Sequence, residues 1–305
     1  MLTDLHDKLK GVGRLDVMTD VNKHALQYYD RQIGDLPPRS RAQRARVLQA
    51  LGADDEERND LGAASKKFEE AARTTSALLA EMPGDPDRIF DQAQSEYYFG
   101  AIDYDRGDFP AAKSAFEKYH ALAKKMLLAA PSDPRPIGEI AYSEGNLCSV
   151  DLRLPKEHKT AINYCLAALG HMEQFVRRTG ATAKDRIALV NRHSWLASAY
   201  FANDDDARAT EQLMIEERIL DVLMRADPLS KQLENFWVPL QRQIAWAELK
   251  SGKNQSARAR LVRAIAVLDD MIKLDPSNDS WARLRAKTEQ DLKQTPAAPG
   301  MEKPR

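Results

Sequence analysis

Small and large apolar residues recur along this chain at a constant spacing. A small residue returns every 48 positions, with one interval of 49, and a bulky apolar residue stands directly before each of them. The small residues are Gly52, Gly100, Cys148, Ala197 and Ala245, and their bulky neighbours are Leu51, Phe99, Leu147, Leu196 and Ile244. A period of this length indicates a repeated supersecondary unit.

Each unit contains a second small residue twelve positions later and a large one four positions after that. The small residues are Ala64, Ala112, Thr160, Ala209 and Ala257, and the large ones are Phe68, Phe116, Tyr164, Leu213 and Leu261. Four units close with a proline, which cannot continue a helix interior and so marks a boundary. These are Pro83, Pro131, Pro228 and Pro276, whereas the third unit has Thr179-Gly180 at that place. The pattern predicts two antiparallel helices per unit, which approach closely at the small residues.

The predicted fold is all-α, an α-solenoid of stacked antiparallel helix hairpins. One hairpin cannot bury its apolar face alone, so such arrays need at least about three units. Residues 38–277 would form five hairpins of about 48 residues each.

The two ends of the chain depart from this pattern. Residues 1–37 read as a truncated repeat, because Leu2, Leu5 and Leu9 make only a short apolar stripe before "GRL" at 13–15. Residues 278–294 read as a capping helix, with Asn278 or Asp279 as its N-cap. The Pro-rich residues 295–305 have little to bury and are expected to be disordered.

The repeat resembles the tetratricopeptide repeat (TPR). The pair Phe99-Gly100, the turn 107–109, and then Ala112, Phe116 and Pro131 fall where that family has its conserved positions. The resemblance implies a right-handed superhelix whose first helices line a concave groove for a protein or peptide. Two departures stand out: the repeat is longer than the usual 34 residues by about two turns in each helix, and the early aromatic of the first helix is replaced. The replacing residues are Leu48, Glu96, Glu144, His193 and Gln241.

The resemblance also selects candidate groove residues. In TPR arrays the positions three before, one after and four after the small residue face the groove, and the position six before flanks it. The candidates for a protein- or peptide-binding groove are Tyr97, Tyr104, Tyr142, Ser149, Asn191, Ser198, Phe201, Arg242 and Trp246. Tyr, Trp and Arg dominate binding energy at interfaces. The alternative is that these rings only pack against neighbouring helices.

One use that the family makes of its groove is not expected here. TPR proteins that clamp a chaperone's C-terminal carboxylate place Lys and Asn at recurrent groove positions. In this chain those positions hold Gln49, Tyr97, Gly145 and Ser194 in one register and Ala53, Ala101, Ser149 and Ser198 in the other. No clamp of this kind is predicted.

Charge and hydropathy narrow the choice of partners. Lys plus Arg number 45 and Asp plus Glu 46, so the net charge of −1 favours neither nucleic acid nor an anionic membrane. The four arginines of "RSRAQRAR" at 39–46 point to different sides of a helix and are followed by acidic residues. No window reaches the roughly 18 apolar residues of a membrane span. Neither nucleic acid nor a membrane is a predicted partner.

Candidate chemistry adds little to this picture. The six histidines form no zinc motif, and phosphate-binding loops and nucleophile elbows are missing from the sequence. No metal, no cofactor and no enzymatic activity are predicted. Cys148 and Cys165 read as reduced, buried thiols, and a cytoplasmic protein is expected because residues 1–16 lack the apolar core of a secretory signal.

The leading functional hypothesis is a non-enzymatic scaffold or sensor that binds a protein or peptide. The long Ala-, Arg- and Asp-rich hairpins also resemble the C-terminal repeat regions of bacterial multi-domain signalling proteins. Three alternatives stay open: a repeat segment of a larger signalling enzyme, a regulator that binds a signal peptide, and an enzyme whose site is built from scattered polar residues.

Overall fold

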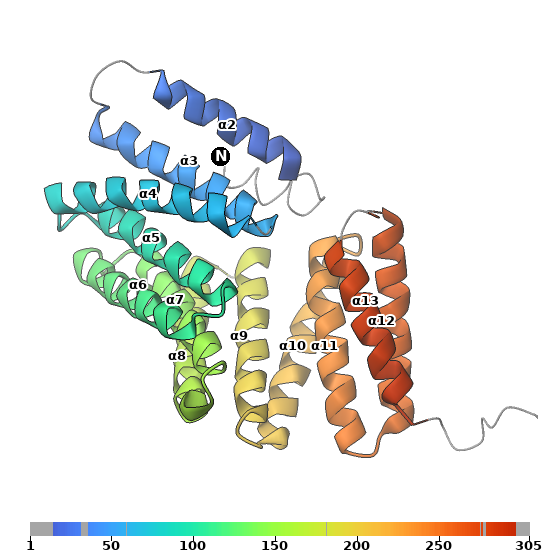
Figure 1. Ribbon diagram of the computed structural model, residues 1–305. Coiled ribbons are helices and arrows are strands. Elements are labelled where there is room, and N and C mark those ends of the chain that lie inside the picture. Colours follow the sequence, from blue (N-terminus) through green and yellow to red (C-terminus); the bar gives the residue numbers. More distant parts are fainter. Residues whose placement is uncertain are drawn as a thin grey trace, which may run out of the picture. The chain divides into compact units, whose positions relative to one another are not determined.

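The computed structural model describes residues 15–31, 36–58, 60–180, 182–274, 276 and 279–296. These residues form twelve α-helices and one turn of 3-10 helix, and no strand occurs among them (Figure 1). The helices are α2 (Leu15–Asp30), α3 (Pro38–Glu57), α4 (Leu61–Glu81), α5 (Pro86–Asp105), α6 (Phe109–Ala129), α7 (Arg135–Asp151), α8 (His158–Thr179), α9 (Ala183–Phe201), α10 (Asp206–Ala226), α11 (Lys231–Lys250), α12 (Asn254–Leu274) and α13 (Asp279–Gln294); the 3-10 turn η1 is Pro155–Glu157. The predicted all-α fold of stacked antiparallel hairpins is confirmed.

The hairpins turn where local chemistry stops one helix and starts the next. The second helices of three hairpins begin at an aspartate whose carboxylate accepts a hydrogen bond from a backbone amide three residues on, as an N-cap does. These bonds measure 2.9 Å at Asp60, 3.1 Å at Asp108 and 3.0 Å at Asp205. Gly107, at φ 79°, makes the left-handed turn before Asp108, a conformation that glycine adopts without steric cost.

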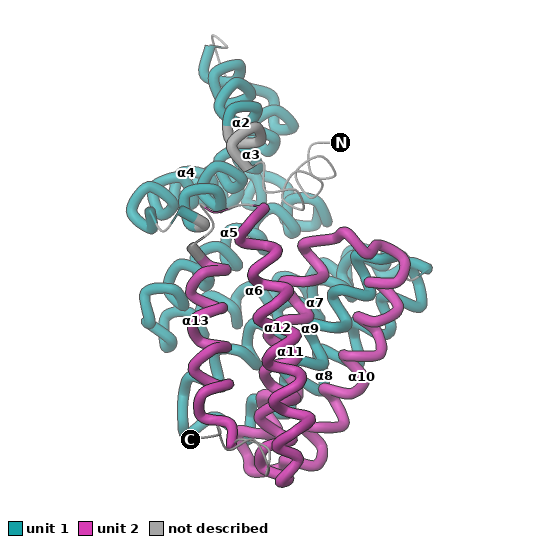
Figure 2. The backbone as a smooth tube through the Cα atoms, turned by 90° about the vertical axis from the view of Figure 1, so that its right-hand side faces the viewer, with its two compact units in different colours: residues 1–10, 14–195 teal, residues 11–13, 196–305 magenta. Residues whose placement is uncertain are grey.

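The chain divides into two compact units (Figure 2). The first comprises the described residues up to Trp195, which include α2 to α8 and most of α9. Within it each helix from α2 to α8 packs against the next. The second begins at Leu196 and contains the end of α9 and α10 to α13, with α10, α11, α12 and α13 packed in sequence. Each unit is thus a local stack of neighbouring helices, as expected for a solenoid.

Close packing inside a hairpin follows the predicted small and large positions. Gly100 on α5 lies under the ring of Phe116 on α6, so near that an added Cβ would be 2.4 Å from Cε1. The same relation holds between Gly52 on α3 and Phe68 on α4, at 2.5 Å. The rings are buried, so the absence of a side chain at the glycines is what lets the helices approach.

The third hairpin corrects the predicted register by one residue. Its second helix buries Ala161 and Cys165, whereas Thr160 and Tyr164 stay partly exposed. The extra residue is accommodated before α8, in the loop that holds η1. The 49-residue interval of the sequence therefore arises between the two helices of this hairpin.

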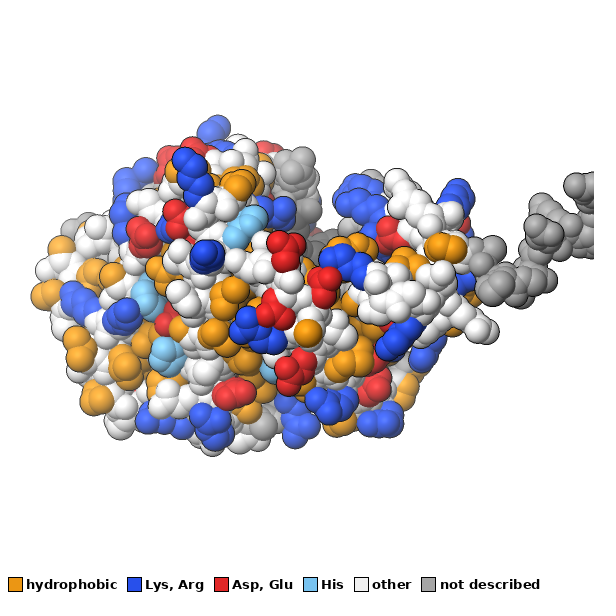
Figure 3. Space-filling model, turned by 90° about the horizontal axis from the view of Figure 1, so that it is seen from below, with side chains coloured by type: hydrophobic (Ala, Val, Ile, Leu, Met, Phe, Trp, Pro, Cys, Tyr) orange, Lys and Arg blue, Asp and Glu red, His pale blue; other side chains and the backbone are white. Residues whose placement is uncertain are grey.

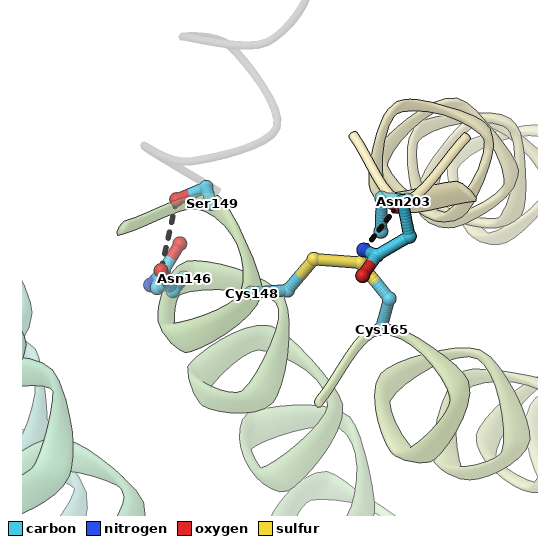
Figure 4. Close-up of a disulfide and its surroundings, with 6 residues drawn as sticks. Asn146, Cys148, Ser149, Cys165 and Asn203 are labelled. Carbon is cyan, nitrogen blue, oxygen red and sulfur yellow. Dashed lines mark hydrogen bonds between the residues drawn. A yellow bond between two sulfur atoms is a disulfide. The ribbon is translucent and has the colours of Figure 1, made fainter. Parts of the chain in front are cut away.

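Cys148 and Cys165 form a disulfide that joins α7 to α8 (Figure 4). Both residues are buried, as predicted, but the interpretation as reduced thiols is wrong. The register shift brings the two cysteines together. Cys165, and not Tyr164, stands opposite Cys148, at the place where the earlier hairpins set a phenylalanine over a glycine.

At the end of the chain α13 covers the last hairpin. Trp281 is buried and its Nε1 donates a 2.8 Å hydrogen bond to Oδ1 of Asn235 on α11, while Leu292 packs against the core of α11 and α12. Other predictions for the ends fall outside the described residues. These are the apolar stripe Leu2, Leu5 and Leu9, the side chains of Asn278 and Asp279 as N-cap candidates, and the tail from residue 297.

Candidate functional site

The nine candidate groove residues divide between the two units. Tyr97, Tyr104, Tyr142, Ser149 and Asn191 belong to the first, and Ser198, Phe201, Arg242 and Trp246 to the second. They come from the first helices of four hairpins, α5, α7, α9 and α11. Each unit is therefore described by itself.

Tyr97 and Tyr104 are largely absorbed into packing. Both rings lie against a buried cluster from α6 and α7 that includes Phe116 and Leu147. The centroid of the Tyr97 ring is 6.5 Å from that of Phe116 and 6.0 Å from that of Tyr119. Burial raises the pKa of Tyr97. The packing alternative considered for these rings thus accounts for much of their surface, although both keep partial exposure.

Tyr104 also links two successive hairpins. Nε of Arg153, which follows α7, donates a 2.8 Å hydrogen bond to the Tyr104 hydroxyl. The Arg153 guanidinium carbon lies 5.7 Å from the centroid of the same ring. The ring also meets Phe109 edge-on, with the two centroids 5.4 Å apart. The phenol is therefore held in one orientation by groups from both hairpins.

Tyr142 has a neighbour that the sequence did not predict. The guanidinium carbon of Arg192, on α9, lies 5.3 Å from the centroid of the Tyr142 ring, within the range of a cation–π contact. Only 6% of Arg192 is exposed. Burial lowers the pKa of its guanidinium, and the nearby Tyr142 and Glu144 oppose this change. Asn191, the candidate beside it, is half-buried.

The two serine candidates are already engaged. The Ser149 hydroxyl donates a 2.8 Å bond to the carbonyl of Asn146 one turn earlier, and Ser149 is 9% exposed (Figure 4). Ser198 is half-buried and also has an interaction partner. Neither hydroxyl stands ready for a ligand in this arrangement.

Polar groups of α6, α7 and α8 bond to one another. The Tyr119 hydroxyl donates to Oε2 of Glu139 at 2.5 Å, and Oε2 of Glu144 lies 2.7 Å from Nδ1 of His171. Nδ1 of His120 is 2.9 Å from the Ser143 hydroxyl. Burial raises the pKa of Glu139 and of Glu144 and lowers that of His120 to about 4. Perturbed pKa values occur both at active sites and in structural networks, and here each group has a partner within the protein.

The second unit brings three candidates near one another on α9 and α11. Phe201 and Trp246 meet edge-on with their ring centroids 4.7 Å apart. Nζ of Lys250 lies 4.1 Å from the Trp246 ring centroid. Trp246 is 44% exposed, which is unusual for so large an apolar ring. Arg242, one turn before Trp246, is not free, because its Nη2 lies 2.7 Å from the carboxylate of Asp291 on α13.

Basic and acidic side chains are intermingled on the face drawn in Figure 3, so the described surface shows no large region of one charge sign there. Among the described helices, none combines the length and apolar character that a bilayer span requires. The described part of the chain also has no group of three His, Cys, Asp or Glu placed to hold a metal.

A hollow of about 640 Å³ lies between α4 and α5. Its wall holds three alanines and Phe99 together with Arg73, Ser76 and Gln92, and Glu69 is its one carboxylate. It does not present the converging carboxylates that would favour an enzyme.

Comparison with known proteins shows which solved structures have a similar fold. No model of a protein family matches the chain, and no curated protein matches it in sequence. The structure is similar to that of BtubC (BKLC) from P. vanneervenii, at 16% identity and a TM-score of 0.61, covering 84% of this chain and 92% of that chain. It is also similar to the apo form of RapI, at 12% identity and a TM-score of 0.53, covering 95% of this chain and 96% of that one.

The chain has a TPR-like repeat fold. At these identities the likeness concerns the fold alone. The TPR-like hairpins of this chain place Tyr97, Tyr142, Phe201 and Trp246 on first helices, as the sequence predicted. Arg192 escaped the prediction because it lies five residues before the small Ala197, outside the offsets used. The one signal for it is Gly145, a glycine inside α7 where nothing in the sequence explains the missing side chain.

Proposed function

We propose that this protein is a non-enzymatic scaffold or sensor that binds a protein or peptide through the groove-facing residues of its first helices. The observation that supports the proposal best is the Phe201–Trp246 pair. A tryptophan left 44% exposed, set edge-on against a second ring, offers a large rigid contact area at low entropic cost. The remaining candidates contribute through the parts of Tyr97, Tyr104 and Tyr142 that stay exposed.

The enzyme alternative has weaker support. Two acids with raised pKa values already have hydrogen-bond partners, Glu139 in Tyr119 and Glu144 in His171. An acid or base that acts on a substrate must be within hydrogen-bond reach of the proton it moves. These groups already form hydrogen bonds with one another.

We propose bacterial signalling as the setting, either for this chain alone or for a larger protein that contains it. The support is the resemblance of the long Ala-, Arg- and Asp-rich hairpins to repeat regions of bacterial signalling proteins.

We also propose a cytoplasmic location. The Cys148–Cys165 disulfide argues against this location, because disulfides are rare in the cytosol. Rapid alkylation of cells, followed by mass spectrometry of the two cysteines, decides the point. Alkylated thiols support the cytoplasm, and a protected disulfide argues for an oxidising compartment.

A site-specific crosslink tests the function. A photoreactive amino acid is placed at Trp246 and, as the matched control, at Val262 on α12, whose side chain is similarly exposed at 51% but lies on a second helix. We expect a discrete protein or peptide to be crosslinked from position 246 in native cells and not from position 262. Adding Phe201→Ala to the first variant should reduce the yield. Equal yields at both positions, or no discrete product at 246, would refute the proposal.

A further inference from the structure

Arg192 is a buried cation whose described partner is the ring of Tyr142 rather than a carboxylate. It is 6% exposed, and its Nε is enclosed without a hydrogen-bond partner among the described residues. No described carboxylate lies within 4.0 Å of its side-chain nitrogens. The buried arginines and lysines of native proteins are nearly always paired. Two other deeply buried charges of this unit follow the rule, since Asp151 pairs with Lys113 and Asp91 with Arg46.

The backbone has made room for this guanidinium. A Cβ added to Gly145 on α7 would lie 1.4 Å from Nη1 of Arg192, so any other residue would expel the side chain. Gly145 stands three residues before the small Cys148, at a position that the TPR resemblance turns toward the groove. A glycine in a helix interior costs about 1 kcal/mol relative to alanine.

Aromatic hydroxyls and one engaged acid surround the charge. Tyr142, Tyr119 and Tyr97 act on the guanidinium electrostatically, together with Glu144. Glu144 already bonds to His171 through Oε2, so it does not serve as the counter-ion. Tyr97 and Tyr142 keep partial exposure. The site therefore combines one cation with aromatic side chains that are not fully buried.

We propose that Arg192 binds the carboxylate of an acidic peptide, as an anchor within the binding surface proposed above. The inference rests on that proposed function and names the chemistry of its partner. A guanidinium presents parallel donors that match a carboxylate, and such charge-assisted pairs are among the strongest hydrogen bonds. A dianionic phosphate fits less well, because it carries more charge than one guanidinium compensates and is repelled more strongly than a carboxylate by Glu144, which acts on Arg192. The aromatic walls would hold the apolar part of the peptide.

The first test observes the site directly. The Nε–Hε signal of Arg192 is assigned by its loss in Arg192→Lys, and sodium acetate is titrated against sodium chloride at equal ionic strength. Three peptides follow: a capped one with a single glutamate, its glutamine counterpart, and the glutamine peptide with a free C-terminus. We expect a saturable shift with acetate, and peptide binding weaker by about tenfold or more when no carboxylate is present. The second and third peptides separate a side-chain carboxylate from a terminal one.

Stability measurements supply the second test. Without a carboxylate ligand, Arg192→Met should unfold at the same or a higher urea concentration than the wild type, because it removes an uncompensated buried charge. The control is Arg260→Met, whose guanidinium pairs with Glu217 and Glu248, and which should unfold at lower urea. An equal loss in both variants would assign Arg192 a purely structural role and overturn the inference.

The outcomes separate the inference from the function on which it rests. No saturable acetate shift, or a shift with inorganic phosphate alone, overturns the carboxylate anchor while the crosslink from Trp246 still stands. If that crosslink is lost and the acetate shift is retained, the scaffold function is refuted, and Arg192 remains an anion-binding site in a protein of another function.

Discussion

Replacing Gly100 by alanine tests the packing rule that builds these hairpins. The new Cβ would lie 2.4 Å from Cε1 and 2.5 Å from Cδ1 of Phe116, whereas carbon atoms in contact prefer about 3.5–4.0 Å. Phe116 is 3% exposed and packs against Leu147 and Val150 of the next hairpin. The ring cannot move aside without disturbing the core between α6 and α7.

Two effects of opposite sign set the magnitude. Alanine gains about 1 kcal/mol over glycine in a helix interior, and overpacking a filled core costs about 1–3 kcal/mol. We therefore expect Gly100→Ala to lose about 0–2 kcal/mol of unfolding free energy, and Gly100→Leu to lose more. Gly170, on the exposed side of α8, has no heavy atom within 4 Å of where its Cβ would stand. Gly170→Ala is the matched control and should gain about 1 kcal/mol.

The chain itself suggests the compensating change. In the hairpin of α11 and α12, Ala245 and Leu261 occupy the positions of Gly100 and Phe116, and they share one core cluster. The double variant Gly100→Ala/Phe116→Leu copies a pair that the protein already packs. It should be more stable than the sum of its single variants, with a coupling of about 1–3 kcal/mol.

Urea unfolding followed by helical circular dichroism measures these differences, and the comparison uses midpoints because repeat arrays can depart from two-state behaviour. Two results would refute the reasoning. A gain in Gly100→Ala equal to that in Gly170→Ala would mean that the ring does not lie over residue 100. Additive single variants would mean that the small and large positions are not a matched pair.

Three further predictions concern the polar and covalent groups of the first unit. Reducing the Cys148–Cys165 disulfide should cost about 3 kcal/mol, because it opens a loop of 17 residues in the unfolded chain; unfolding with and without a reductant measures this, and an unchanged midpoint would contradict it. Lys113→Met should cost about 3–5 kcal/mol, since it strands the fully buried carboxylate of Asp151, whose Oδ1 lies 2.7 Å from the ammonium; the double variant with Asp151→Asn should recover part of the loss in the same assay. Burial holds the pKa of His120 at about 4, below the value of 6.5 for an unfolded chain, so the unfolded state binds the proton first. The wild type should therefore lose stability relative to His120→Gln as pH falls from 6.5 to about 4, and parallel pH profiles of the two proteins would refute this assignment.

The repeat architecture was readable from the sequence because packing constrains residue size at a few fixed places. Where two helix backbones approach, only a small residue fits, and the ring that fills the space must face it, as Gly100 and Phe116 do. The helix ends were readable for a similar local reason, since Asp108 caps α6 and Gly107 makes the turn before it. Such rules act between residues close in sequence and apply to each hairpin in turn. The same residue sizes therefore recur along the chain at a constant spacing.

The site was predictable only in part. The family resemblance pointed to Phe201 and Trp246, which lie together on first helices, but it also pointed to Ser149 and Arg242, whose polar groups are already bonded within the protein. A residue's position on a helix face follows from its number. Whether its polar atoms are free depends on neighbours from other hairpins.

Three features needed the tertiary structure: the register of the third hairpin, the disulfide, and the placement of Arg192 against Tyr142 with no described carboxylate beside it. One extra residue in a loop moves every buried position of the following helix by one residue, as at Ala161 and Cys165. The sequence period alone does not say whether the extra residue lies before or after that helix. The shift brings Cys165 opposite Cys148. The guanidinium of Arg192 reaches Gly145 from another hairpin, 47 residues along the chain. The sequence by itself determined the repeating hairpins, because their contacts are local and recur, whereas these single long-range contacts occur once and leave no pattern to read.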